Sequence, residues 1–230
     1  MSKMFYMDES NGFSAKLKVI GVGGGGCNAL NNMVDACVQG VEFIAANTDI
    51  KSLSMCKAPT KIQMGSKLTR GLGAGANPEI GRQAALEDIE KITEHLKGSD
   101  MVFITCGLGG GTGTGASTVI AEISKDLGAL TVAIATKPFT FEGKDRMIQA
   151  ENGVAQLKTR VDSLITIPNQ RLLSIGGKHM TIMEAFLKAD EVLLNAVRSI
   201  SDLIVGSGHV VVDFADVKTI MSERGMAIMG

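Results

Sequence analysis

Continuous apolar runs of strand length recur along the chain. Five such runs, rich in β-branched residues, lie at residues 17–22, 42–46, 101–106, 130–135 and 163–167. They do not alternate with polar residues, and continuous runs are typical of strands that are covered on both faces. The stretches between them have helical periodicity, so strands and helices alternate along the chain. This order predicts an α/β fold with a Rossmann-like, doubly wound parallel sheet.

Helical segments are predicted over residues 78–97, 112–127 and 143–160. The first opens with Asn77-Pro78, a pair typical of a helix start. A fourth helix begins with a capping box, because Thr181 precedes Glu184 by three residues. It runs from 182 to about 203 and is long enough to pass through the middle of the molecule.

Composition and charge narrow the possible classes of function. The 230 residues are 45% hydrophobic and 20% charged, which suits a globular chain with one sizeable core. A formal net charge of −1 gives no general attraction to nucleic acid or to an anionic membrane. No run approaches the ~18 apolar residues of a membrane span. Residues 1–15 lack the pattern of a secretion signal and are expected to form a flexible tail.

The cysteines and histidines do not suggest a metal site. The four cysteines form no CxxC pair, and the three histidines lie far apart in the sequence. We therefore expect neither a disulfide framework nor a zinc site, and the free thiols fit a reducing cytoplasm.

The first of two glycine clusters lies at residues 21–28 (GVGGGGCN), directly after a predicted strand and before a helical segment. Glycines let backbone N–H groups approach phosphate oxygens closely, and a helix N-terminus adds partial positive charge. A tight turn without a ligand is the simpler interpretation of this cluster alone. The cluster also satisfies GxGxxG, and Glu42 lies roughly where a dinucleotide fold keeps its ribose-binding acid. A dinucleotide-dependent enzyme is therefore one alternative.

The second cluster, residues 107–115 (GLGGGTGTG), also lies between a strand and a helix and adds two threonine hydroxyls. Two such loops on one sheet favour a triphosphate over a flexible hinge. Neither loop contains a lysine, and GxxxxGK[ST] is absent from the sequence. The charge of a triphosphate would then be balanced by Mg²⁺ and by Arg146, although Arg146 could equally be a solvated helix charge.

The second loop contains GGGTGTG and resembles the tubulin-type signature GGGTG[ST]G. Further motifs narrow the resemblance to the FtsZ family of tubulin-like GTPases. They are AANTD (45–49), GLGAGANPEIG (71–81), PFTFEGKDRM (138–147), IPNQRLL (167–173) and VDFADVKTIMSE (212–223). The resemblance extends from about Lys18 to Gly225, and it implies the tubulin/FtsZ type of α/β fold with a long central helix near the C-terminal end.

The resemblance assigns a nucleotide site. It places Gly24, Gly25, Gly26, Cys27, Asn28, Ala74 and Gly75 at the phosphates, with Gly110, Gly111, Thr112, Gly113 and Thr114 in the signature loop. It implies ribose contacts from Glu142 and Arg146, and guanine contacts from Asn169, Phe186 and Asp190. A carboxylate at Asp190 can accept hydrogen bonds from two guanine N–H groups that adenine lacks, and Phe186 can stack on the base. Without the resemblance, Phe186 would be interpreted as a core residue.

Asp213 and Asp216 lie in the sequence DFAD, far along the chain from the phosphate loops. From the pattern alone, two acids before an apolar helix are typical of an N-cap and a favourable first-turn charge. The resemblance implies instead that they are catalytic, enter the nucleotide site of the next subunit and orient the attacking water, so that hydrolysis depends on assembly. The family usually has Asn where this chain has Val211, which removes a polar group beside the pair.

By the resemblance, the chain is expected to be a Mg²⁺-dependent GTPase that forms head-to-tail filaments for the division ring at mid-cell in the cytoplasm. The expected organisation is a GTP-binding domain at 16–180, a central helix at 181–205, and an acidic loop with the start of the next helix at 206–230. The second domain and the C-terminal peptide that binds division-ring adaptors are expected to be missing. Two alternatives remain: a GTP-binding module without turnover, and a dinucleotide-dependent enzyme, against which the second glycine loop argues.

Overall fold

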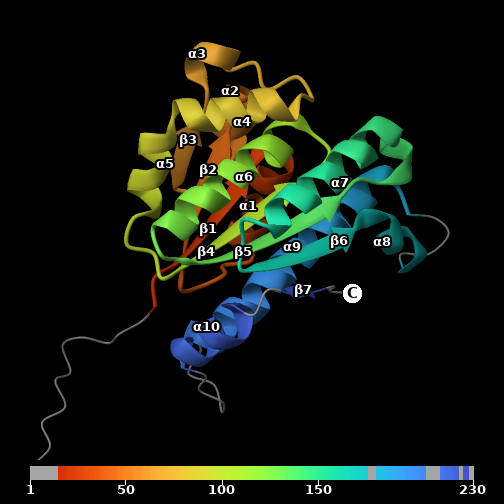
Figure 1. Cartoon of the computed structure of the whole chain (residues 1–230). Helices are drawn as coiled ribbons and strands as arrows, with labels where there is room; N and C mark the ends of the chain where they lie inside the picture. Colours follow the sequence, from red (N-terminus) through yellow and green to blue (C-terminus); the bar gives the residue numbers. More distant parts are fainter. Residues whose placement is uncertain (1–14, 176–179, 206–212, 223–224, 228–230) are drawn as a thin grey trace, which may run out of the picture.

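A seven-stranded sheet forms the centre of the molecule (Figure 1). The computed structural model describes residues 15–175, 180–205, 213–222 and 225–227. The strands are β1 (Leu17–Val22), β2 (Val41–Asn47), β3 (Thr60–Gln63), β4 (Met101–Gly107), β5 (Leu130–Lys137), β6 (Ser163–Pro168) and β7 (Gly225–Ala227). Their order is β3-β2-β1-β4-β5-β6-β7, and every neighbouring pair is parallel. This confirms the predicted Rossmann-like parallel sheet, whose order reverses between β1 and β4.

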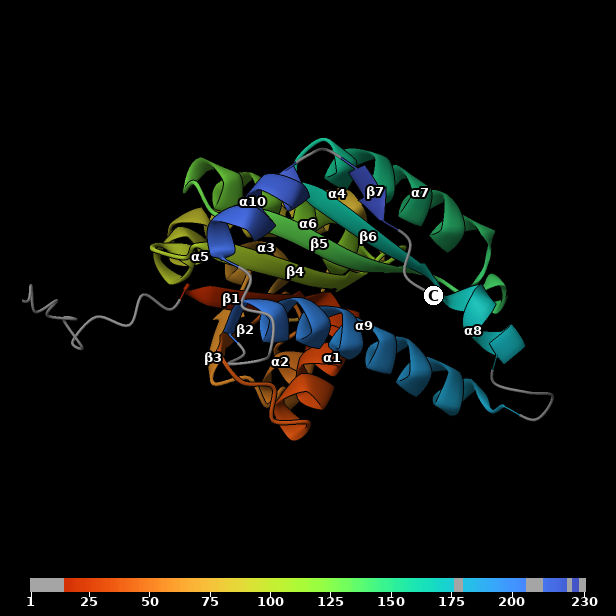
Figure 2. The ribbon, with the colours of Figure 1, turned by 90° about the horizontal axis from the view of Figure 1, so that it is seen from below.

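Helices cover both faces of the sheet (Figures 1 and 2). They are α1 (Gly23–Asp35), α2 (Ile50–Met55), α3 (Ser66–Thr69), α4 (Pro78–Glu87), α5 (Ile89–Leu96), α6 (Gly111–Asp126), α7 (Lys144–Lys158), α8 (Asn169–Ile175), α9 (Ile182–Val205) and α10 (Phe214–Ser222), with a 3-10 turn, η1, at Thr140–Glu142. Successive residues of β4 alternate between two cores: Phe103 packs towards α1 and α9, and Ile104 packs towards α4, α5 and α6. Both faces of the strand are buried, as the continuous apolar runs predicted.

The long helix α9 begins with the predicted capping box. The N–H of Glu184 donates to the Thr181 hydroxyl at 3.2 Å, and the N–H of Thr181 donates to the Glu184 carboxylate at 2.7 Å. The helix spans 24 residues, or about 36 Å, and crosses one face of the sheet (Figure 2). No helix among the described residues is both long and apolar enough to cross a membrane.

Two sequence expectations differ from the structure. The helix expected over 78–97 is broken at Asp88, whose carboxylate accepts a hydrogen bond from the Gly65 N–H at 2.8 Å and pairs with Lys91. The chain was also expected to end inside a helix, but α10 ends at Ser222, and residues 225–227 pair with β6. Val211 and residues 1–14 lie outside the described residues.

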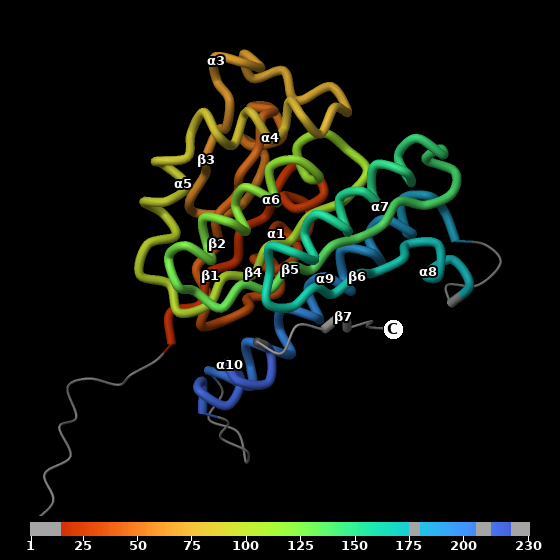
Figure 3. The backbone as a smooth tube through the Cα atoms, in the orientation of Figure 1, coloured from red at the N-terminus to blue at the C-terminus, as the bar shows by residue number. Residues whose placement is uncertain are grey.

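The carboxyl ends of the central strands position the candidate site. The first glycine cluster follows β1, and the second follows β4, its neighbour in the sheet. Figure 3 shows both connections turning at the same edge of the sheet, where β1 leads into α1 and β4 leads into α6. In parallel sheets this edge is where ligands bind.

Candidate functional site

The first glycine loop places the start of α1 against the sheet without an intervening linker. β1 ends at Val22, and α1 begins at Gly23. A Cβ on Gly26 would lie 2.5 Å from the carbonyl oxygen of Thr105 in β4, so only glycine allows this approach. A Cβ on Gly24 would meet nothing within 4 Å, because Gly24 faces open space. The loop thus has one surface that packs on the sheet and one that is free to receive a ligand.

The second glycine loop packs directly against the first. A Cβ on Gly23 would lie 2.8 Å from the backbone nitrogen of Gly113. Helix α6 begins at Gly111 with no side-chain cap on its first turn, and neither α1 nor α6 has an acidic residue in its first turn. The N-termini of two helices, whose backbone N–H groups have no side-chain cap, therefore converge, and this arrangement attracts anions.

The loops border a cavity of about 540 Å³ at the carboxyl edge of the sheet. Twelve of the predicted site residues line it: Gly24, Gly25, Asn28, Gly110, Gly111, Thr112, Gly113, Glu142, Arg146, Asn169, Phe186 and Asp190. Arg146 is the only cationic side chain among the described lining residues. The partial positive charge at the glycine loops therefore comes from backbone N–H groups and not from lysine or arginine side chains of the loops.

Five predicted phosphate-site residues do not line the cavity: Gly26, Cys27, Ala74, Gly75 and Thr114. Gly26 packs on β4, and the Cys27 side chain is buried in the core. The Ala74 methyl group packs on Gly111, and the Thr114 hydroxyl accepts a hydrogen bond from the Gly109 N–H at 2.8 Å. Ala74 and Thr114 thus support the shape of the signature loop, and direct phosphate contacts from these five residues stay a prediction.

Polar lining residues from the end of β2 were missed by the sequence reasoning. Asn47, Asp49 and Ser52 line the cavity beside the signature loop. The Thr48 hydroxyl lies 2.6 Å from the Thr112 hydroxyl, which ties the end of β2 to the signature loop. For Asn47 and Asp49 the available signal was their position at the end of a buried strand in AANTD, because polar residues at a strand's carboxyl end share the edge with the glycine loops, whereas Ser52 lies beyond this motif in α2.

The oxygen donors at the end of β2 suit Mg²⁺. The Asp49 carboxylate accepts hydrogen bonds from the Lys51 N–H and the Ser52 hydroxyl, each at 2.9 Å. The bond from the Ser52 hydroxyl is the main reason that the pKa of Asp49 is below its usual value. No group of three or more His, Cys, Asp or Glu side chains that could hold a metal ion occurs among the described residues. A single carboxylate with amide and hydroxyl oxygens fits an ion that takes its remaining ligands from phosphates and water.

The other end of the cavity has groups suited to a planar base. Asn169 is 4% exposed, and its Oδ1 has no hydrogen-bond partner within the described protein. Burial raises the pKa of Asp190 to about 7. Phe186 is 39% exposed and contacts Phe139 edge to face, with 5.2 Å between ring centroids. The interpretation of Phe186 as a core residue is therefore wrong, and its ring is free to contact a ligand.

Between the two ends, Glu142 and Arg146 form an ion pair with 2.8 Å between Oε2 and Nη1. The other carboxylate oxygen of Glu142 accepts a hydrogen bond from the Phe139 N–H at 2.9 Å, which fixes the turn before α7. The Arg146 side chain is 51% exposed and lines the cavity. The position of Arg146 is compatible with a ligand contact, and its role at a phosphate or ribose stays a prediction.

The interpretation of Glu42 as a dinucleotide-binding acid is wrong. Glu42 is the second residue of β2, so it lies near the amino end of that strand, whereas a ribose-binding acid lies at the carboxyl end. Its carboxylate pairs instead with Lys18 at 3.5 Å.

Asp213 and Asp216 are exposed and lie far from the cavity of their own chain. Asp213 directly precedes α10, which lies towards the C-terminal end of α9, whereas the N-terminal half of α9 lines the cavity (Figure 1). The Asp213 carboxylate accepts a hydrogen bond from the Ala215 N–H at 3.3 Å, and Asp216 lies in the first turn. This local geometry fits the N-cap interpretation. The position of α10 keeps both acids apart from the glycine loops of the same chain.

The fold and the paired glycine loops define a nucleotide-binding α/β domain without a P-loop. Residues 16–177 match the model of the Tubulin/FtsZ family, GTPase domain. The chain belongs to the Tubulin/FtsZ family.

Individual relatives agree with this assignment. The chain is 60% identical to the cell division protein FtsZ of Azotobacter vinelandii over 227 residues, which cover 99% of the chain and 58% of that protein. It is 59% identical to the FtsZ of Pseudomonas aeruginosa, with the same coverage of both chains. A solved structure of an FtsZ dimer from M. jannaschii is 51% identical, superposes with a TM-score of 0.89, and is matched over 92% of this chain and 62% of its own length. The chain thus spans about 58% of the length of the curated relatives it matches.

Proposed function

We propose that the chain binds GTP in the 540 Å³ cavity, with the triphosphate at the two glycine loops and guanine between Phe186, Asn169 and Asp190. The observation that carries this proposal is the chemical difference between the two ends of the cavity. One end offers helix N-termini and backbone N–H groups, and the other offers an exposed aromatic ring beside hydrogen-bond acceptors. A nucleoside triphosphate has the matching arrangement of charge and planar base.

Guanine fits the base end better than adenine. The ionised Asp190 carboxylate accepts hydrogen bonds, and guanine presents two N–H donors on one edge where adenine presents an acceptor. The unpartnered Oδ1 of Asn169 is a further buried acceptor. An adenine base would leave these acceptors unpaired, and each such loss costs about 1–3 kcal/mol.

Mg²⁺ would be held beside Asp49, Asn47 and Ser52, and it would supply charge neutralisation for the β- and γ-phosphates. Arg146 and the α1 and α6 N-termini would orient the phosphates. Since these groups come from rigid elements, they need little rearrangement to receive the nucleotide.

Hydrolysis would require a second subunit. Asp213 and Asp216 lie towards the end of α9 that is remote from the cavity (Figure 1), so one chain cannot bring these two acids to the nucleotide in its own cavity. In a head-to-tail filament, the end of the molecule that bears α10 would meet the cavity of the next subunit, and the two carboxylates would position the attacking water. The M. jannaschii relative is described as a dimer, which supports self-association.

The cellular role that follows is a nucleotide-controlled filament for cell division, as the names of the curated relatives indicate. Its expected place is the mid-cell ring in the cytoplasm, with adaptors reached through sequence outside this chain. The second candidate is a GTP-binding module without turnover. The Asp213 hydrogen bond to Ala215 favours it, because an N-cap accounts for this acid without catalysis.

The test is phosphate release from GTP at rising protein concentration, with ATP as the control nucleotide. A shared site predicts a steep concentration dependence and no release from Asp213→Ala or Asp216→Ala, although both variants still bind GTP. Mixing Asp213→Ala with Asp190→Ala should restore activity, because each variant supplies the part that the other lacks. GTP binding without phosphate release at any concentration would establish the binding module, and equal use of ATP would refute the assignment of the base site.

A further inference from the structure

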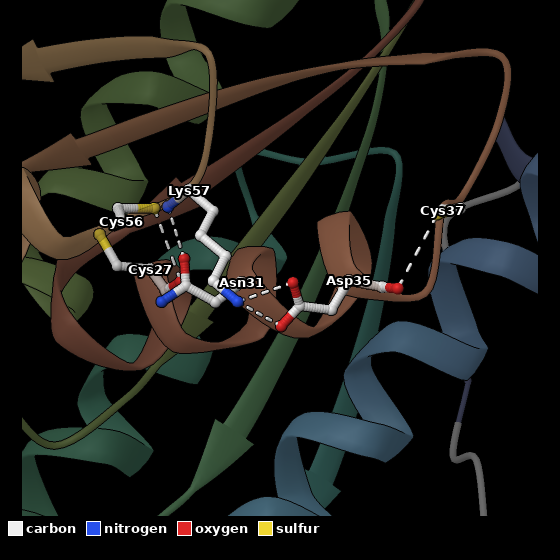
Figure 4. Close-up of polar contacts among 6 residues, drawn as sticks. All are labelled: Cys27, Asn31, Asp35, Cys37, Cys56 and Lys57. Atoms are coloured by element: carbon white, nitrogen blue, oxygen red, sulfur yellow. Dashed lines mark hydrogen bonds and ion pairs between the residues drawn. The ribbon is translucent and has the colours of Figure 1, made fainter.

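Two thiols meet beneath the first glycine loop. Cys27 lies in the first turn of α1, and Cys56 directly follows α2. The Cys56 thiol donates a hydrogen bond to the backbone carbonyl oxygen of Cys27, with 3.7 Å between Sγ and oxygen. Figure 4 shows both cysteine side chains in the same region, with the contact from the Cys56 sulfur to the Cys27 backbone drawn as a dashed line. Both residues are buried, at 2% and 3% exposure, so the contact is held by the fold and not by chance collision at the surface.

The segment that carries Cys56 is fastened to α1. The backbone N–H of Lys57 donates a hydrogen bond to the side-chain oxygen of Asn31 at 2.7 Å, and the Lys57 ammonium group forms an ion pair with Asp35 at 2.6 Å (Figure 4). These contacts follow Cys56 directly in the chain and lie one and two turns beyond Cys27 on α1. They keep the two thiols opposite one another.

The two sulfurs are chemically unequal. The neighbouring Cys27 thiol lowers the pKa of Cys56, against the opposing effect of burial, and the Ala58 N–H and the Lys61 charge act in the same direction. The neighbouring Cys56 and burial raise the pKa of Cys27. Cys56 is therefore the more readily ionised of the two thiols, and the thiolate is the reactive form of cysteine.

The other two cysteines provide an internal comparison. Cys106 lies in β4 on the opposite face of the sheet, and burial raises its pKa to about 12. Cys37 is exposed just beyond the end of α1, and its nearest polar contact is the Asp35 carbonyl oxygen at 3.8 Å. Neither of them contacts a second thiol among the described residues.

The thiol pair is connected to the cavity and can be reached from the surface. Asn47, which lines the cavity, directs its Nδ2 to the Cys27 sulfur at 3.9 Å, and Asn28 also lines the cavity. Helix α2 has six residues, of which only Leu53 is buried. Because short helices with few buried contacts open at low cost, a small oxidant can reach Cys56 by local opening of α2.

We propose that Cys27 and Cys56 are an oxidisable dithiol that hydrogen peroxide converts to an intramolecular disulfide, and that this bond weakens nucleotide binding in the adjacent cavity. The second half rests on the proposed function. The Cys56 thiolate attacks the peroxide O–O bond and becomes a sulfenic acid, while the leaving oxygen takes a proton and departs as water. The Cys27 sulfur then attacks the sulfenic sulfur, loses its proton and releases a second water. Two thiols are oxidised, and one peroxide is reduced.

The effect on the cavity follows from the position of the bond. A covalent bond is shorter than a hydrogen-bonded contact, so the first turn of α1 must shift towards the end of α2. That turn contains the cavity-lining Gly24 and Gly25. The disulfide also moves the sulfur atom that the Asn47 amide contacts at 3.9 Å. A thiol reductant reverses both changes.

The test uses the whole chain, treated with hydrogen peroxide in slight excess. We expect a mass loss of about 2 Da, two of the four thiols remaining, and a Cys27–Cys56 linked peptide in a digest without reductant. Cys37→Ser should behave as the parent, and Cys56→Ser should not lose this mass. The affinity for GTP, measured with a fluorescent analogue, should fall about tenfold or more on oxidation and return with dithiothreitol.

The peptide map tests the disulfide, and the GTP affinity tests its connection to the cavity. Oxidation confined to Cys37, or a mass loss that persists in Cys56→Ser, would refute the thiol pairing, and the peptide map of the parent decides this even if a variant folds poorly. A mapped Cys27–Cys56 bond with unchanged GTP affinity would refute the connection to the cavity. If the reduced parent does not bind GTP at all, the proposed function fails, while the mass and the peptide map still test the disulfide.

Discussion

The carboxyl group of Asp190 is expected to make the affinity for GTP depend on pH near neutrality. It lies at the base end of the cavity, and burial raises its pKa to about 7 in the nucleotide-free protein. Only the ionised form accepts two hydrogen bonds from guanine, so nucleotide binding must release a proton whenever the carboxyl is protonated.

The magnitude follows from linkage. With a pKa of about 7, Asp190 is about nine-tenths ionised at pH 8 and about one-tenth ionised at pH 6. If the bound nucleotide holds the carboxylate ionised throughout, the affinity for GTP falls about tenfold between pH 8 and pH 6, which corresponds to about 1.4 kcal/mol.

The assay is equilibrium titration with GTP at pH 6, 7 and 8, for the parent and for Asp190→Asn. The terminal phosphate also titrates near neutral pH, and the Asn variant carries that contribution alone. Asp190→Asn should bind GTP more weakly at pH 8 and with a smaller pH dependence. An identical dependence in both proteins would refute the role of Asp190 as a titrating acceptor for the base.

The same carboxyl group should lower the stability of the nucleotide-free protein at high pH. Because its folded-state pKa is above its ordinary value of 3.8, folding favours the protonated form. The free energy of unfolding of the parent should therefore fall, relative to Asp190→Asn, as the pH rises from about 4 to about 7, and level off above that. Urea denaturation of both proteins at pH 4.5 and pH 8 measures this change, and a stability difference between parent and Asp190→Asn that is the same at both pH values would contradict it.

Three further predictions follow from contacts around the site. Gly115→Ala should destabilise the protein by about 3 kcal/mol in urea denaturation, because a Cβ there would lie 1.8 Å from a carbonyl oxygen of α4. Gly24→Ala should change the stability by no more than about 0.5 kcal/mol, because a Cβ there meets no atom within 4 Å, and it should weaken GTP binding. Equal stabilities of the two variants would contradict the packing argument. Thr181→Ala removes the capping box of α9 and should lower the free energy of unfolding by about 1 kcal/mol, with Thr181→Ser as the control that retains it. Arg146→Gln should weaken GTP binding and reduce its dependence on salt, and an unchanged salt dependence would show that Arg146 does not face the phosphates.

The central part of the fold could be predicted from the sequence because its strands are buried on both faces. All five predicted strands are present. β3 was missed because it has four residues, two of them the polar Lys61 and Gln63, and β7 because it has three residues without a pattern. The break at Asp88 depends on a hydrogen bond to Gly65, a contact between distant residues that local periodicity does not encode.

The position of the glycine loops at the cavity could be predicted from the sequence, and the other end of the cavity was less predictable. Glycine clusters after strands indicate phosphate loops through backbone chemistry, which the sequence displays directly. The unpartnered oxygen of Asn169 and the raised pKa of Asp190 arise from burial, which depends on how α8 and α9 pack. The contact between Cys27 and Cys56 joins two helices that are separated by a strand, so no spacing rule signals it.

The seam between α4 and α6 consists largely of backbone on both sides. At Gly81 and Gly115 an added Cβ would lie 2.3 Å and 1.8 Å from carbonyl oxygens of the opposite helix. A surface of this kind has no side chain whose enlargement could be offset by shrinking a neighbour. A substitution at one of these glycines therefore cannot be compensated by a second substitution on the opposite helix. Sequence divergence among descendants of this chain should accumulate around the seam and leave its glycines unchanged.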